Sequence, residues 1–99
     1  MRVIAELQII PIGTGLSLSR HVAEAVRLIQ ESGLCYHLHA MGTDIEGEWE
    51  EVLDLVKRCS NRLLELGVPR LAVNLKLAVR SDREGTMADK VASVERLLG

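Results

Sequence analysis

The sequence predicts one α/β domain, in which two helices cover a single face of a four-stranded antiparallel sheet. Three observations support this fold class: strand-like alternation of apolar and polar residues, helix-like spacing of apolar residues between those strands, and a length of 99 residues. Such a chain fits one domain, residues 1–99, and leaves much of its surface uncovered. Association with further copies is therefore expected.

Residues 2–10 show the clearest strand pattern, because Glu6 and Gln8 point away from the side that carries the apolar residues. Pro11 is expected to end this strand. The apolar positions are Val3, Ala5, Leu7 and Ile9.

A helix is expected from about residue 19 to residue 32, where apolar residues recur at helical spacing. Ser17 or Ser19 can supply the N-cap oxygen, and Gly33 is placed to end the helix. The apolar stripe consists of Val22, Val26 and Ile29, with Ala25 beside it.

A hairpin follows, made of a strand over residues 34–40, a tight turn, and a short strand around residues 43–46. Tyr36 shares one face of the first strand with two leucines, whereas His37 and His39 share the other face.

A second helix is expected from about residue 48 to residue 66, with acidic residues early and basic residues late, as the helix dipole favours. Residues 70–79 alternate as a fourth strand. The last helix begins at Thr86, which together with Asp89 resembles a capping box.

The order β-α-β-β-α-β plus a C-terminal helix is that of the ferredoxin-like fold. Right-handed crossovers place the two main helices on one face of the sheet, so the opposite face is left to polar side chains. Two alternatives stay open: these side chains face solvent or a partner, or some of them come together at an assembly interface and line a small-molecule pocket. Three of them, Glu6, Asn74 and Lys76, are expected on neighbouring central strands. The open-face residues are Glu6, Gln8, His37, His39, Asn74 and Lys76.

The composition argues against several function classes. A net charge of -2 and only two aromatic residues provide neither a basic surface nor a stacking platform for nucleic acid. No apolar run approaches the ~20 residues of a membrane span, and acid at Glu6 comes too early for a signal peptide, so a cytoplasmic protein is expected. Cys35 and Cys59 form no CxxC pattern and are expected as buried free thiols.

The loop over residues 11–19 leads from a strand into a helix N-terminus and carries the hydroxyls of Thr14, Ser17 and Ser19. Its glycines and backbone N–H groups suit a phosphate or another polar group, although its spacing matches neither the Walker nor the dinucleotide motif. The alternative is a loop that only caps the helix.

Glu46 lies at the turn from a strand into a helix, where a carboxylate suits an aminopyrimidine. The alternative is that Glu46 and Glu48 cap the helix that follows.

His37 and His39 stand about 6.5 Å apart on one strand face and could share a metal with Glu6. Two histidines without a further Cys or His are a weak signal, so we predict ordinary surface or interface histidines and no metal site. Hydrolysis is equally weakly supported: Arg20 and Asn74 match the residue types of an acylphosphatase, but that family's glycine-rich frame is missing.

Several segments, taken in order, resemble the small thiamine-binding protein family of archaea and bacteria. They are Pro11-Ile12-Gly13-Thr14, Ser17-Leu18-Ser19, Tyr36, Met41-Gly42-Thr43 and Ile45-Glu46-Gly47-Glu48, and the likeness continues through Gly67 and Arg70 to Lys90-Val91. The resemblance implies a ferredoxin-like fold, dimers formed through sheet faces, and often tetramers. It also implies binding of thiamine or its hydroxymethylpyrimidine moiety without an established catalytic step or a further cofactor. The ligand-binding candidates carried over are Thr14, Ser17, Ser19, Tyr36, Thr43 and Glu46.

The fourth strand departs from that family, whose members commonly end it with a Lys-Ile-Asp-Asp-Arg-like run. Ala78 and Val79 stand here in place of the two acids. A different ligand therefore stays open, as do three other readings: a structural or regulatory oligomer that binds another small or anionic molecule, a small hydrolase, and a metal-binding protein.

Overall fold

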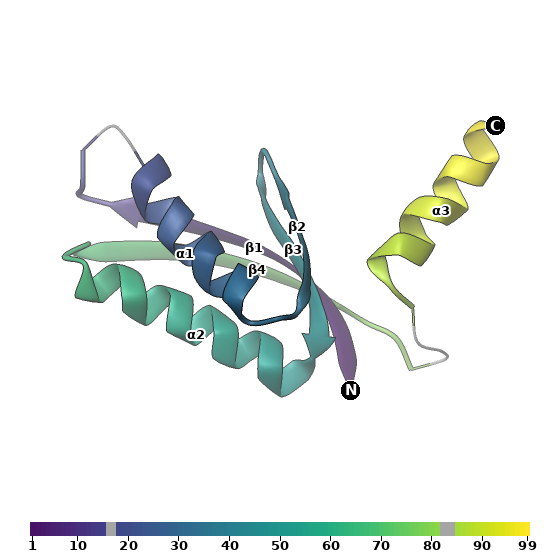
Figure 1. Cartoon of the computed structure of the whole chain (residues 1–99), viewed down its shortest axis with the longest axis horizontal. Helices are drawn as coiled ribbons and strands as arrows, with labels where there is room; N and C mark the ends of the chain where they lie inside the picture. Colours follow the sequence, from purple (N-terminus) through teal and green to yellow (C-terminus); the bar gives the residue numbers. More distant parts are fainter. Residues whose placement is uncertain (16–17, 82–84) are drawn as a thin grey trace.

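The computed structural model describes residues 1–15, 18–81 and 85–99 (Figure 1). Their order confirms the predicted ferredoxin-like fold with an additional C-terminal helix. The elements are β1 (Arg2–Ile12), α1 (Ser19–Glu31), β2 (Cys35–His39), β3 (Gly42–Glu48), α2 (Trp49–Glu65), β4 (Arg70–Val79) and α3 (Met87–Leu98).

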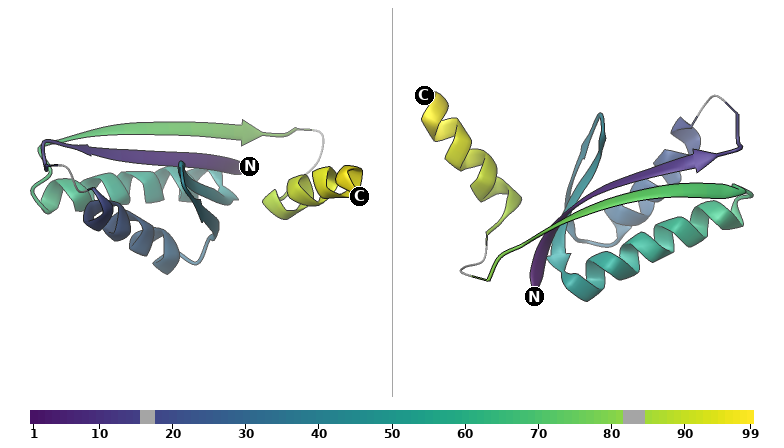
Figure 2. Two further views of the ribbon diagram at one scale, coloured as in Figure 1. Left: turned by 90° about the horizontal axis from the view of Figure 1, so that it is seen from above. Right: turned by 180° about the vertical axis from the view of Figure 1, so that it is seen from behind.

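The four strands form one sheet in the order β2-β3-β1-β4, and every neighbouring pair is antiparallel. In the register, Ala5 of β1 lies between Ile45 of β3 and Leu77 of β4, so these three side chains share a face. Figure 2 shows α1 and α2 on the same side of the sheet, as predicted, and α3 standing apart from both.

The hydrophobic core lies between this helix-covered face and the two helices. Val3, Ala5 and Leu7 of β1 are buried and Ile9, the next residue in the alternation, is partly buried, as the period of two requires. The other core residues are Ala25 and Ile29 of α1, Ile45 of β3, Val52, Leu55, Cys59 and Leu63 of α2, and Val68.

The expectation that Pro11 ends the first strand is wrong, because β1 continues to Ile12. Only β4 accompanies β1 beyond Leu7, since the pairing with β3 stops there. One edge of β1 is therefore open at Pro11, where a missing N–H breaks no ladder.

The N-cap of α1 also differs from the prediction. Leu18 occupies the cap position without a side-chain hydrogen bond, and Ser19 is the first residue of the helix. Ser17 lies outside the described residues. The capping box of α3 is confirmed, because Asp89 N–H donates to Thr86 Oγ1 (3.0 Å) and Thr86 N–H donates to Asp89 Oδ2 (3.2 Å).

The last helix carries apolar residues at helical spacing, and this apolar stripe of α3 does not join the core. It consists of Met87, Val91, Val94 and Leu98. Val94 and Leu98 are 58% and 81% exposed, and α3 contributes no buried residue. Exposed side chains of this kind on a helix are typical of a surface that another element or molecule covers. None of the helices in the described ranges is both long enough and apolar enough to span a bilayer.

The two cysteines are free, but only Cys59 is buried. Burial raises the pKa of the Cys59 thiol to about 11, because the charged form loses its hydration. Cys35 is exposed, contrary to the expectation, since it shares the uncovered sheet face with His37.

Leu55→Ala tests the placement of the core. Leu55 is fully buried, so its truncation is expected to lower the free energy of unfolding by about 2–5 kcal/mol in urea denaturation. Leu64→Ala, on the same helix but 48% exposed, is the matched control and should change it by about 0.5 kcal/mol or less. Equal losses would contradict the assigned face of α2.

Candidate functional site

The predicted ligand residues of the hairpin lie on two different faces of the sheet. Tyr36 pairs directly with the buried Ile45, and Thr43 lies two residues before Ile45 on β3. Both side chains therefore point to the same, helix-covered side of the sheet. Glu46, one residue further along β3, points to the open side. These three side chains therefore do not form one cluster within the subunit.

A groove runs along the helix-covered side between α1 and the β2–β3 hairpin. Its inner part is a cavity of about 230 Å³, and Thr43 supplies a polar group to its largely apolar lining. Leu38 faces this side yet remains 53% exposed, since α1 does not close over β2. The inner part is lined by, among others, Leu7, Val22, Ala25, Val26, Leu38 and Thr43.

The outer part of the groove continues over the surface of α1, where Ser19 and Gln30 join the lining. Both parts are lined by Leu38, by Val22 and Val26 of α1, and by Leu18 at its N-cap, so the two hollows are continuous. Gln30 Nε2 donates to the Tyr36 hydroxyl (3.1 Å), which places Tyr36 beside the same helix. Ser19, Tyr36 and Thr43 thus lie along or beside the groove.

Glu46 caps a helix, but not the one that follows it in sequence. Its carboxylate is almost buried (8% exposed) and accepts the backbone N–H of Met87 at the start of α3 (2.9 Å). A carboxylate at a helix N-terminus is stabilised by the helix dipole. The helix that follows is capped instead by Glu48, whose N–H donates to Glu51 (3.3 Å).

Cys35 lies directly across from Glu46 in the β2–β3 pairing. A hydrogen bond to the Glu46 carboxylate raises the pKa of the Cys35 thiol, with desolvation and the nearby negative charge acting in the same direction.

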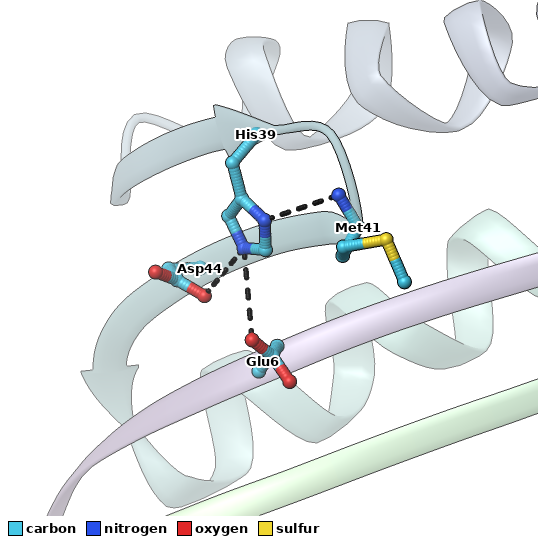
Figure 3. Close-up of polar contacts among 4 residues, drawn as sticks. All are labelled: Glu6, His39, Met41 and Asp44. Atoms are coloured by element: carbon cyan, nitrogen blue, oxygen red, sulfur yellow. Dashed lines mark hydrogen bonds and ion pairs between the residues drawn. The ribbon is translucent and has the colours of Figure 1, made fainter.

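The open face carries a second group of polar residues, drawn in Figure 3. His39 Nε2 lies 3.0 Å from Asp44 Oδ1 and 3.7 Å from Glu6 Oε2, so one imidazole bridges carboxylates on β3 and β1. The other ring nitrogen, Nδ1, accepts the backbone N–H of Met41 (3.3 Å). His37 stands beside this group, with its ring centroid 6.1 Å from that of His39.

The remaining open-face residues lie where the alternation predicts. Asn74 Nδ2 donates to Gln8 Oε1 (3.1 Å), and Lys76 is directly opposite Glu6 in the register. The strands that carry them are neighbours as expected, but β4 is an edge strand rather than a central one. Arg20 is in α1, on the other side of the sheet from Asn74, so an acylphosphatase-like Arg–Asn pair is not assembled.

Two polar atoms near the first loop are buried without a hydrogen-bond partner in the described part of the chain: Thr14 Oγ1 and His21 Nδ1. Neither residue lines the groove. Sequence reasoning singled out Thr14 but not His21, and it also missed Asp44. Asp44 becomes a neighbour of Glu6 only through the β1–β3 register, which the sequence pattern does not fix.

The fold and these surfaces define a ferredoxin-like protein with a groove on one side and an uncovered polar sheet face on the other. The sequence model of the thiamine-binding protein family matches residues 5–95, and the chain belongs to this family. It is 42% identical over 98 residues to a UPF0045 protein of Synechocystis, covering 99% of this chain and 81% of that one.

Solved structures give the same result for the fold. A Methanocaldococcus jannaschii protein superposes with a TM-score of 0.89 at 34% identity, covering 95% of this chain and 96% of that one. A Thermotoga maritima protein, whose name refers to thiamine biosynthesis or salvage, superposes with a TM-score of 0.84 at 23% identity. That comparison covers 95% of this chain and 99% of the other.

Glu46→Gln tests the contact between Cys35 and the carboxylate. Removing the negative charge and the carboxylate acceptor is expected to lower the pKa of Cys35 toward its usual range. More thiolate is then present at pH 8, so iodoacetamide should alkylate the variant faster than the parent protein. Cys35→Ser is the control, and it should leave only the buried Cys59, which reacts on unfolding. An unchanged rate in Glu46→Gln would contradict the contact.

Proposed function

We propose that this protein is a non-catalytic binding protein for thiamine or its hydroxymethylpyrimidine moiety, and that it acts as a homo-oligomer. Membership of the thiamine-binding family supports the ligand class. The observation that carries the proposal to particular residues is the groove between α1 and the β2–β3 hairpin, with Thr43 in its inner part.

The size and chemistry of the groove suit one substituted pyrimidine ring. About 230 Å³ is just below the range of about 300–1,000 Å³ that is typical of drug-sized ligands. Apolar side chains such as Leu38 and Val26 would pack against the ring faces, while a few polar groups fix its orientation. We assign this polar role to Thr43 in the inner part and to Ser19 in the outer part of the groove.

Glu46 has a different role in this proposal. Its carboxylate points to the open side and is already bound to the N-terminus of α3, so a ring in the groove would not reach it. Thr14 and Ser17 precede α1 in the sequence, and we keep them as candidates for the polar end of the ligand.

The homo-oligomer is supported by two surfaces that a single subunit leaves uncovered. One is the open sheet face, where Ile12 and Cys35 are exposed together with the polar residues. The other is the apolar stripe of α3, in which Leu98 is 81% exposed. Further copies of the chain would cover both surfaces. We therefore propose dimers that form through the sheet faces and that associate further into tetramers.

Calorimetric titration tests the ligand and its position together. Thiamine, its phosphates and hydroxymethylpyrimidine are the ligands to compare. Thr43→Val keeps the shape of the side chain but removes the hydroxyl, and it is expected to weaken binding roughly three- to tenfold, about one hydrogen bond.

Glu46→Gln is the control and should leave the affinity unchanged. No heat from any of these ligands at millimolar concentration would refute the proposed function. Weaker binding in Glu46→Gln with normal binding in Thr43→Val would move the ligand to the open face.

Val94→Glu tests the role of α3 in assembly. A charge in the apolar stripe is expected to reduce the mass of the particle measured by light scattering after size exclusion, without loss of helical content. Ala92→Glu, which the 100° turn per residue places on the opposite side of α3, should leave the mass unchanged. A parent protein that is monomeric at all concentrations would overturn the assembly.

A further inference from the structure

We infer that Glu6, His39 and Asp44 form a binding site for a divalent transition-metal ion, specifically Zn²⁺, on the open face of the sheet. The three side chains are the group of His, Cys, Asp and Glu residues in the described part of the chain whose ligand atoms all lie within 4.8 Å of one another. The site can be tested separately from thiamine binding, because the proposed ligand residue Thr43 points to the opposite side of the sheet. It adjoins both other proposals, since His39 is also among the residues that line the inner part of the groove and the open face is the one through which dimers are proposed.

The spacing of the ligand atoms matches a zinc site. Two donors bound to tetrahedral Zn²⁺ at about 2.0–2.1 Å stand about 3.4 Å apart. His39 Nε2 lies 3.0 Å from Asp44 Oδ1 and 3.7 Å from Glu6 Oε2, on either side of that value. The Glu6 side chain is 52% exposed, so it has room to rotate toward a bound ion.

Three separate strands hold the donors. Glu6 and Asp44 are direct partners in the β1–β3 register, and His39 comes from the end of β2. Because the sheet fixes these backbones, an ion would find its ligands already assembled and would lose little free energy in ordering them. One imidazole and two carboxylates leave a fourth position open, as in zinc sites that keep a water molecule.

Charge and donor type favour zinc over magnesium or calcium. The charges of the two carboxylates together balance that of a divalent ion, and His39 already lies between them. Imidazole nitrogen is a good ligand for Zn²⁺, while magnesium and calcium prefer more oxygen donors than the three residues supply.

Metal binding requires one change at the hairpin turn. Coordination through Nε2 puts the imidazole proton on Nδ1, which then cannot accept the N–H of Met41. That hydrogen bond is long (3.3 Å), and Met41 lies at the exposed tip of the hairpin, 69% exposed, where the N–H can bind water instead. The turn should therefore shift when the ion binds.

The test uses the whole chain, stripped of metal with a chelator and titrated with ZnCl₂ by calorimetry. One Zn²⁺ per chain is expected, and the amide resonance of Met41 should shift during the titration. Co²⁺ in place of Zn²⁺ should give the intense visible absorption of a four-coordinate site. His39→Ala should abolish binding.

Asp44→Asn and Glu6→Gln keep the side-chain shapes and should each weaken Zn²⁺ binding by more than about tenfold. Removing a residue that only hydrogen-bonds to a metal ligand already lowers metal affinity by about that factor, and the loss of a ligand itself should cost more. His37→Ala is the matched control, because this histidine is the neighbour of His39 but is outside the ligand group. It should bind Zn²⁺ as the parent does.

The inference is overturned if the parent takes up no Zn²⁺ at millimolar concentration, if His39→Ala retains the affinity, or if His37→Ala loses it. Lower thermal stability of His39→Ala without any effect of Zn²⁺ on the parent would instead make the group a metal-free cross-strand contact.

Discussion

The one-sided coverage of the sheet is the constraint on which the rest of this structure depends. The two helices that connect the strands both lie on one face of the sheet and shield only that face, whereas strand side chains alternate between the two faces. Ala5 is therefore fully buried, while its neighbour Glu6 is 52% exposed in its side chain. The buried half of each strand builds the core, and the other half remains available for polar contacts and for partners.

The start of α3 is held by a polar contact on that uncovered side. Met87 N–H binds a carboxylate that the fold has almost fully removed from water. Burying such a charge is costly unless donors replace its hydration, and the N-terminus of a helix provides both a donor and a favourable dipole. Glu46 thereby holds the start of a helix that has no buried residue of its own in the described part of the subunit, which makes α3 a natural contributor to contacts between subunits.

The β2–β3 hairpin separates the two candidate sites and contributes to both. Thr43 points into the groove, and Asp44, the next residue, points to the open face. The turn before them requires glycine, because a Cβ on Gly42 would lie 2.7 Å from the carbonyl oxygen of Leu7. Glycine therefore permits the start of β3 to approach β1 closely, and the strand pairing then places His39 beside the carboxylates.

The sequence by itself determined the element order, the helix-covered side of each strand and the open-face residues, because periods of 2 and 3.6 are local properties of the chain. It also determined the capping box at Thr86, whose partners are three residues apart. Only the tertiary structure decided the partner of Glu46, the pairing of Glu6 with Asp44, and the exposure of Cys35. These depend on strand register and on the path of α3 after β4, which are set by contacts between residues far apart in the chain and leave no periodic signal in the sequence.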